Sequence, residues 1–308
     1  MPAPRLIAID MDGTLLNSSG GISARNAAAL HLAEEAGAEV VIATGRRHAY
    51  AMRVLRSFDL RAESALISSN GTVIRTIRNE LLHRTHLPLE TALWLCEHLE
   101  DFRNTLVATF DAVDAVGEEQ RGALVCEQLD DLHASIDAWM QSNAPYLAHV
   151  PRLEDALHAG ETPPIQMMVC GGIERMSAAE ARLLEDPRVT AVGAAERSGA
   201  EIALHRTIYP ERDLSIVDIL PAGCSKASAL KHLAELRGIT TQEILAIGDN
   251  WNDAPMLRLA GRAALMSNAP KDLQELARAS GWHIAPSNDE DGVAATIENA
   301  FALSAANA

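Results

Sequence analysis

Two carboxylates separated by one residue, Asp10 and Asp12, are the feature of this sequence best suited to chemistry. They follow the apolar run of residues 6–9 and precede Gly13 and Thr14. An apolar run bounded by a turn signal predicts a buried strand of a parallel sheet, and open α/β sheets bind ligands at the carboxyl ends of their strands. Two neighbouring acids repel each other unless a cation or a shared proton offsets the charge. The pair therefore indicates a metal-assisted reaction centre.

Polar residues also follow other short apolar runs. They are Thr44 after residues 39–43, Asn70 after residues 65–68, Asp249 with Asp253 after residues 243–247, and Asn268 after residues 263–266. The carboxyl ends of parallel strands meet at one edge of a sheet. We therefore expect these side chains to converge on the edge that carries Asp10 and Asp12.

The elements that must position these residues are strands and helices that alternate along the chain. This alternation stops near residue 87, where the predicted strands become shorter, and it resumes near residue 213. Helices are predicted at 24–35, 226–236 and 292–300, a hairpin at 73–75 and 80–82, and a last strand near 282–284. The fold class expected is α/β, with a doubly wound, Rossmann-like parallel-sheet core formed by residues 1–86 and 213–308. An α+β domain at 87–212 is inserted into it. Its predicted helices are 91–101, 129–141 and 177–185, and its predicted strands are 106–110, 165–169, 189–192 and 201–204.

Composition narrows the classes of partner. The net charge of −16 makes nucleic acid and anionic membranes poor partners, so an anionic substrate needs a local cation. No apolar run approaches the roughly 20 residues of a membrane span, and the start of the chain lacks the layout of a signal peptide, so we expect a cytoplasmic protein. The four cysteines form no CxxC pair, and buried, reduced thiols are expected.

The residues at the predicted sheet edge match the requirements of phosphoryl transfer. Asp10 can attack phosphorus, and Asp12 can give and take the proton. Asp249 adds the further acid that helps to hold Mg²⁺, an ion that prefers oxygen ligands. Thr44 and the Gly45 amide can donate hydrogen bonds to phosphate. Lys226, near a predicted helix start, supplies a fixed positive charge.

The same residues resemble the four ordered motifs of the haloacid dehalogenase-like superfamily of hydrolases. The motifs are residues 10–14 (Asp-Met-Asp-Gly-Thr), residues 44–46 (Thr-Gly-Arg), Lys226, and residues 248–253 (Gly-Asp-Asn-Trp-Asn-Asp). Residues 69–71, 268–269 and 291–293 are similar to secondary signatures of its Cof-like branch. In that branch an α+β cap of type IIB lies between the second and third motifs, and this cap sets substrate specificity. In this chain the alternation of strands and helices is interrupted at the same place.

The resemblance implies a role for each matching residue. Asp10 would be the nucleophile and Asp12 the acid and base. Mg²⁺ would be held by the Asp10 carboxylate, the Asp12 main-chain carbonyl and Asp249. Phosphate would contact Thr44, Gly45, Lys226 and Asn252, while Asp253, Asn70 and Arg46 would support the site. One departure is Ala227, where a glycine usually follows the lysine.

The function expected is a Mg²⁺-dependent phosphatase of small phosphorylated metabolites, such as a sugar phosphate or a cofactor phosphate, acting through an aspartyl-phosphate. The partner is a small metabolite, without nucleic acid or membrane, and the protein is a monomer or a homodimer. A phosphomutase of similar architecture and a non-catalytic phosphosugar-binding or regulatory protein remain alternatives. A signalling receiver fits less well, since its phosphoaccepting aspartate lies mid-chain and it needs no inserted domain.

Overall fold

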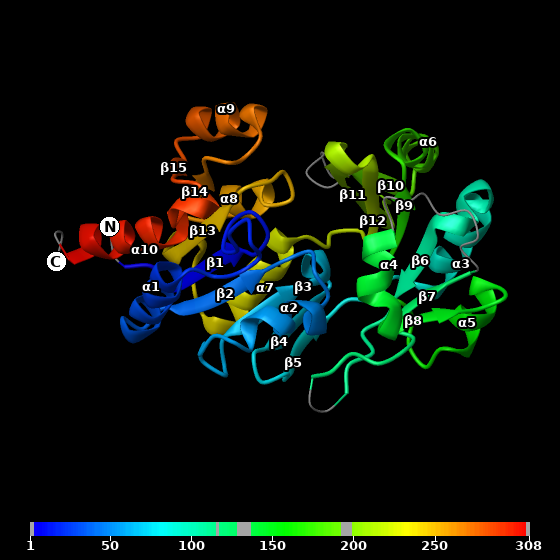
Figure 1. Ribbon diagram of the computed structural model, residues 1–308, viewed down its shortest axis with the longest axis horizontal. Coiled ribbons are helices and arrows are strands. Elements are labelled where there is room, and N and C mark those ends of the chain that lie inside the picture. Colours follow the sequence, from blue (N-terminus) through cyan, green and yellow to red (C-terminus); the bar gives the residue numbers. More distant parts are fainter. Residues whose placement is uncertain (1–2, 115–116, 128–136, 192–198, 306–308) are drawn as a thin grey trace. The chain divides into compact units, whose positions relative to one another are not determined.

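A computed structural model describes residues 3–114, 117–127, 137–191 and 199–305, and the chain forms two compact units (Figure 1). The core unit comprises Met1–His83 and Ser225–Ala308, and the inserted unit comprises Arg84–Cys224. The inserted unit extends beyond the carboxyl end of the insert predicted at 87–212, because β12 (Leu214–Pro221) pairs with β9 and β11 of the same unit. At its other end it begins at Arg84. Its two ends lie together, since the side chains of Thr85 and Cys224 are hydrogen-bonded.

The core unit is built on an eight-stranded sheet in the order β15-β14-β13-β1-β2-β3-β4-β5. The strands are β1 (Leu6–Asp10), β2 (Glu39–Ala43), β3 (Ala65–Ser68), β4 (Val73–Thr76), β5 (Leu81–Arg84), β13 (Ile244–Gly248), β14 (Arg262–Met266) and β15 (His283–Ala285). The pairs from β15 to β3 are parallel, and β4 turns back antiparallel to β3. The six parallel strands, the hairpin and the α/β class predicted from the sequence are confirmed.

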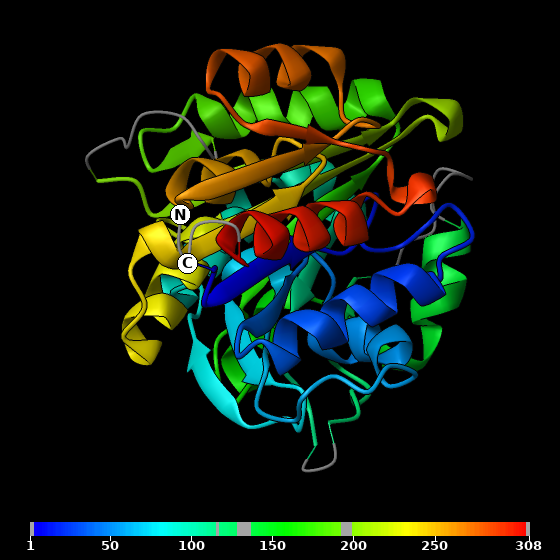
Figure 2. The same ribbon diagram turned by 90° about the vertical axis from the view of Figure 1, so that its left-hand side faces the viewer.

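Helices cover both faces of this sheet. The helices are α1 (Ala24–Glu35), α2 (His48–Leu55), α7 (Lys226–Arg237), α8 (Ala254–Leu259), α9 (Lys271–Ala279) and α10 (Gly292–Ala305). Buried residues of α1, α2 and α10 form one hydrophobic core with the sheet, and those of α7, α8 and α9 form another. Figure 2 shows α1 and α10 side by side. With both faces covered, β1 is buried along its whole length, which explains its unbroken apolar sequence.

Serine side chains cap the amino ends of two helices of the core unit. Ser23 caps α1 by accepting a hydrogen bond from the Asn26 N–H at 3.0 Å. Ser225 caps α7 in the same way, accepting from the Ser228 N–H at 3.1 Å. Ala227 lies inside α7 and its φ is not positive, so the missing glycine of the family pattern places no strain on the backbone.

The inserted unit has its own seven-stranded mixed sheet in the order β10-β11-β12-β9-β6-β7-β8. The remaining strands are β6 (Leu106–Thr109), β7 (Leu124–Cys126), β8 (Leu147–His149), β9 (Gln166–Gly171), β10 (Val189–Ala191) and β11 (Ile202–Tyr209). The helices are α3 (Leu89–His98), α4 (Asp137–Asn143), α5 (Leu153–Ala159) and α6 (Ile173–Leu184). The sequence did not predict β7, β8, β12 or α5. The helix predicted at 129–141 lies partly outside the described residues.

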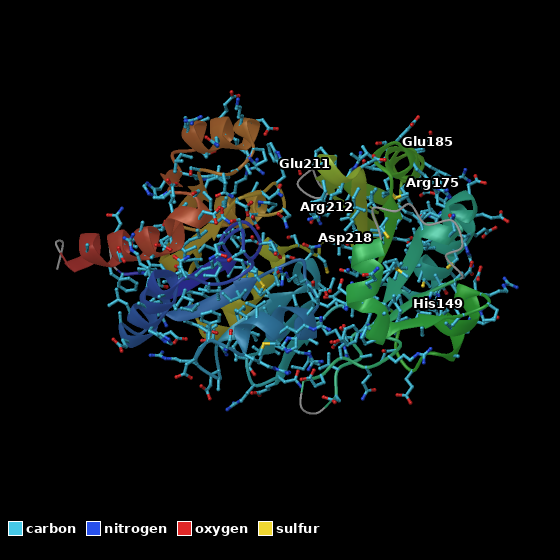
Figure 3. The ribbon with its side chains drawn as sticks, viewed as in Figure 1. His149, Arg175, Glu185, Glu211, Arg212 and Asp218 are labelled. Carbon is cyan, nitrogen blue, oxygen red and sulfur yellow. The ribbon has the colours of Figure 1, made fainter. Side chains whose placement is uncertain are left out.

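The two faces of this second sheet differ in character. Helices α3, α5 and α6 bury an apolar core against one face. The strand registers place a continuous row of residues on the other: His205, Asp218, Met168, Val107, Cys126 and His149. Asp218 on β12 and His149 on β8 can be followed in Figure 3. His205 Nδ1 lies 3.6 Å from Asp218 Oδ2. This face therefore mixes polar groups with an apolar surface.

None of the described helices is long and apolar enough to cross a membrane. The four cysteines are free and buried, as expected from the sequence.

Candidate active site

A buried lysine joins the first strand of the core unit to the turn after β13. Lys226, the first residue of α7, donates from Nζ to Asp10 Oδ1 at 2.5 Å and to Asp253 Oδ1 at 2.7 Å. The Lys226 side chain is 1% exposed and that of Asp253 is fully buried. Because ions without partners are strongly disfavoured out of water, this geometry fixes all three side chains.

Asp249 comes close to the loop after β1. Its Oδ1 accepts a hydrogen bond from the Thr14 hydroxyl at 2.8 Å. Gly13 has φ +79°, and a Cβ built there would lie 2.4 Å from Asp249 Oδ2. A side chain at position 13 would therefore be excluded both by its backbone conformation and by the carboxylate.

Asp253 braces the turn that carries Asp249. Its Oδ2 accepts from the N–H groups of Asp249 and Asn250, both at 3.0 Å, while its Oδ1 accepts from Lys226. Both carboxylate oxygens are thus engaged inside the protein. Asn252 lies half-buried in the same turn. We interpret Asp253 as a residue that positions its neighbours.

Burial shifts the ionisation of this cluster. Desolvation, reinforced by the Asp253 charge, raises the pKa of Asp10 well above its usual value. The same two causes raise the pKa of Asp249 to about 7, against a lowering by the Thr14 hydrogen bond. Burial would lower the pKa of Lys226, but the Asp10 and Asp253 carboxylates outweigh it and raise that pKa. The cluster therefore holds more negative charge than its one lysine offsets.

The loops after β2 and β3 are tied to each other. The Asn70 N–H donates to the Thr44 carbonyl at 3.1 Å, and the Ser69 N–H donates to the Arg46 carbonyl at 2.8 Å. Ser69 and Asn70 both have positive φ, at 48° and 53°, a conformation that non-glycine residues rarely adopt. Gly71 follows, and a Cβ there would lie 2.2 Å from the Ser225 carbonyl oxygen. This strained turn therefore packs directly against the start of α7.

Arg46 holds the second aspartate of the opening pair. Its Nε donates to Asp12 Oδ2 at 2.8 Å and its Nη2 donates to Asp12 Oδ1 at 2.5 Å. The Asp12 side chain is 56% exposed, so it remains open to solvent and to a substrate. Asn268, the last of the predicted strand-end residues, instead donates from Nδ2 to the Gly13 carbonyl at 2.8 Å and so supports the first loop.

Three of these acids can approach one cation. Ligand oxygens of Asp10, Asp249 and Asp253 lie within 4.8 Å of one another, and no other such group of three was found among the described residues. Their donor set consists of hard oxygens with excess negative charge, which suits Mg²⁺. Since both oxygens of Asp253 are already bonded, Asp10 and Asp249 are the acids that fit the metal best.

One residue of the cluster was given no role from the sequence. Thr14 is fully buried, and its hydroxyl orients Asp249. It is the last residue of the first motif, but a contact across 235 residues of sequence leaves no local trace.

Comparisons with known proteins identify the family of the chain. The model of the haloacid dehalogenase-like hydrolase family matches residues 7–297, so the chain belongs to this family of hydrolases. The 5-amino-6-(5-phospho-D-ribitylamino)uracil phosphatase YwtE of Bacillus subtilis (strain 168) is 30% identical over 306 residues, covering 96% of this chain and 97% of the relative.

Two other known proteins are similar to this chain over nearly its whole length. Phosphatase YwpJ of Bacillus subtilis (strain 168) is 30% identical over 305 residues, covering 94% of this chain and 97% of the relative. A solved haloacid dehalogenase-like hydrolase from Bacteroides thetaiotaomicron superposes with a TM-score of 0.72 at 26% identity, covering 96% of this chain and 99% of that one. The resemblance to the Cof-like branch is thereby confirmed.

Proposed function

We propose that this hydrolase is a Mg²⁺-dependent phosphatase of small phosphorylated metabolites. The observation that carries the proposal is the buried cluster in which Lys226 contacts both Asp10 and Asp253 while Asp249 stands close by. A phosphoryl group at this place would find a nucleophile and a fixed cation. When bound, Mg²⁺ would be held by Asp10, Asp249 and the Asp12 carbonyl, and it would neutralise charge on the phosphate oxygens.

The chain's own residues divide the work in this proposal. Asp10 attacks phosphorus and becomes an aspartyl-phosphate as the leaving oxygen departs. Asp12, exposed and held by Arg46, gives that oxygen its proton and later takes one from the attacking water. Thr44, Gly45, Lys226 and Asn252 hold the phosphate. Asp253 keeps Lys226 and the Asp249 turn in place, and Asn70 and Arg46 support the loops.

The names of the relatives support the substrate class that we propose. YwtE is named for a phosphorylated ribitylaminouracil, which is a small metabolite. A substrate of that class, a sugar phosphate or a cofactor phosphate, is proposed here as well. We also propose that the inserted unit recognises the organic part of the substrate. We further propose a cytoplasmic location and a monomer or homodimer.

A phosphate-release screen tests the proposal. Purified native chain and Asp10→Asn would be incubated with a panel of phosphorylated metabolites, with Mg²⁺ and with EDTA. The expected result is release by the native chain from some members of the panel, only with Mg²⁺, and none by Asp10→Asn. Absence of release from every member, or equal release by Asp10→Asn, would refute the mechanism. Transfer of phosphate within a substrate instead of its release would indicate a mutase.

A further inference from the structure

Trp251 is a large apolar side chain left in solvent on a loop of the proposed site. It is 45% exposed and lies in the turn after β13, two residues from Asp249. The other exposed large apolar residues of the core unit's described part, Leu32, Leu81 and Leu236, lie on α1, β5 and α7. Single exposed apolar side chains are common on proteins, so the position of Trp251 needs further support before it carries meaning.

The other tryptophans show how the chain otherwise uses this residue. Trp94, Trp139 and Trp282 are each partly buried against a hydrophobic core. An indole ring buries more apolar surface than almost any other side chain, so leaving it exposed gives up stabilisation of the fold. Trp251 is the tryptophan for which the fold supplies no such core.

The backbone under Trp251 is held firmly. Its N–H donates to Asn250 Oδ1 at 2.8 Å, and its carbonyl accepts from the Ala254 N–H at 3.3 Å. The Asn250 N–H is itself bonded to the buried carboxylate of Asp253. The ring is therefore presented from the same turn that fixes Asp249, rather than from a loose loop. An aromatic ring carried on a firmly held backbone loses little entropy when a ligand stacks on it.

The residues that flank Trp251 in the turn indicate what its ring adds to the site. Asp249, Asn250 and Asn252 are polar. These groups suit phosphate and metal, but none offers a flat apolar surface. An indole face does so, and it attracts planar rings by offset stacking.

We propose that Trp251 is a specificity-determining residue whose indole stacks on a planar ring in the organic part of the substrate. The proposal rests on the proposed phosphatase function and narrows its substrates to ring-bearing phosphate esters. It predicts that Trp251 governs affinity for such esters and has little influence on the chemical step.

A pair of probe substrates tests this. Native chain, Trp251→Ala and Trp251→Phe would be assayed with 4-nitrophenyl phosphate, which carries a ring, and with glycerol 3-phosphate, which does not. Trp251→Ala should raise KM for the ring-bearing ester about 3- to 10-fold, with kcat within about twofold. Trp251→Phe should keep most of the affinity. The kinetics of glycerol 3-phosphate should not change.

Leu236→Ala provides the matched control, since it removes another exposed apolar side chain from the far end of α7. It should leave both esters unaffected, and thermal unfolding should show the same fold for all variants. Equal losses for both esters in Trp251→Ala, or no change for 4-nitrophenyl phosphate, would overturn the proposal while leaving the phosphatase function intact.

A binding measurement separates this inference from the function on which it rests. If the native chain hydrolyses neither ester, tryptophan fluorescence is recorded in metal-free buffer during titration with each. Quenching by 4-nitrophenyl phosphate beyond that seen in Trp251→Phe, without a response to glycerol 3-phosphate, would support stacking even though hydrolysis had failed. Equal quenching in the native chain and Trp251→Phe would refute it.

Discussion

Charged side chains are held away from water in both units, but the two clusters behave in opposite ways. In the core unit, Lys226 faces Asp10 and Asp253 with Asp249 beside them, and burial raises the pKa of Asp10 and of Asp249. In the inserted unit, Arg103 faces Glu127 and Glu154. There the Arg103 hydrogen bonds lower the pKa of Glu154 to about 2.

The two clusters differ in how fully the cation is hydrogen-bonded and in how much water reaches the charged groups. Arg103 donates from Nε, Nη1 and Nη2 to both glutamates and to the Cys96 carbonyl, which uses the whole guanidinium fork. Its side chain and those of its partners remain roughly a fifth exposed, so water screens the remaining charge. Lys226 donates two hydrogen bonds, to Asp10 and Asp253, and these side chains are too deeply buried for water to screen their charge. The comparison suggests that one cluster stabilises the fold, whereas the other is incomplete until a cation or a phosphate arrives.

Replacing the lysine should have the largest effect. Lys226→Met leaves Asp10 and Asp253 buried without their cation, which typically destabilises a protein by about 3–5 kcal/mol. Loss of a fixed charge on the phosphate should also lower kcat/KM by at least about 100-fold. Urea unfolding and phosphate release measure the two effects. Unchanged activity in a folded Lys226→Met protein would contradict the proposed role.

The equivalent change in the other cluster should affect stability alone. Arg103→Met removes the hydrogen bonds that Arg103 donates to two partly exposed glutamates, and we expect a loss of about 1–3 kcal/mol in unfolding free energy. Since Arg103 has no part in the chemistry, kcat should stay within about twofold. A fall in kcat comparable to that of Lys226→Met would remove the distinction between the clusters.

Neutralising one acid in each cluster should change stability in opposite directions. Asp10→Asn, without metal at pH 7, should raise the unfolding free energy by about 1 kcal/mol or more, because folding no longer has to bury or protonate that carboxylate. Glu154→Gln should lower it by a similar amount, because it weakens two charge-assisted hydrogen bonds. Thermal unfolding in EDTA compares them. Destabilisation by both would show that the Asp10 charge is already offset.

The pH dependence of the stability of the fold should distinguish the two clusters, with the smallest of the expected effects. The raised pKa of Asp249 means that its proton stabilises the fold below about pH 4, and this contribution is lost as pH rises through about 7. The lowered pKa of Glu154 has the opposite sign, with stabilisation above about pH 4.5 that is lost as pH falls towards about 2.

Mg²⁺ competes with the proton on Asp249, so its effect on the melting temperature should be larger at pH 8 than at pH 6. The stabilisation expected is about 1–3 kcal/mol at saturating ion. Asp249→Asn should reduce the shift at both pH values, whereas Glu154→Gln should not alter it. An equal Mg²⁺ shift at both pH values would argue against Asp249 as a ligand.

The two units also differ in how far the sequence predicts them. In the core unit, buried strands end at or just before four polar residues, Asp10, Thr44, Asn70 and Asp249. A run of apolar residues without alternation, followed by a polar residue, therefore locates each of them. The structure places these strand ends along neighbouring parallel strands, as expected. What the pattern did not reveal was the Thr14–Asp249 contact, which depends on the pairing of distant segments.

The inserted unit is less predictable because tertiary pairing decides its elements. β7 and β8 are three residues long, too short for a periodic pattern. Arg103 and its two glutamates are separated by 24 and 51 residues. No local sequence signal links them, and the pairing of β6 with β7 and the packing of α5 against β7 bring them together.

The hydrogen bond between Thr85 and Cys224 joins the two ends of the inserted unit, and this lowers the entropy that the core unit loses by carrying an insert. The entropy lost on closing a connection grows only with the logarithm of its flexible length, and a folded insert whose ends touch behaves as a short connection. The distance along the chain between Asp10 and Lys226 therefore imposes little penalty on assembling the site. An insert of another length or sequence, if its ends also met, would leave the buried cluster unchanged, so the inserted unit can diverge while the proposed chemistry stays constant.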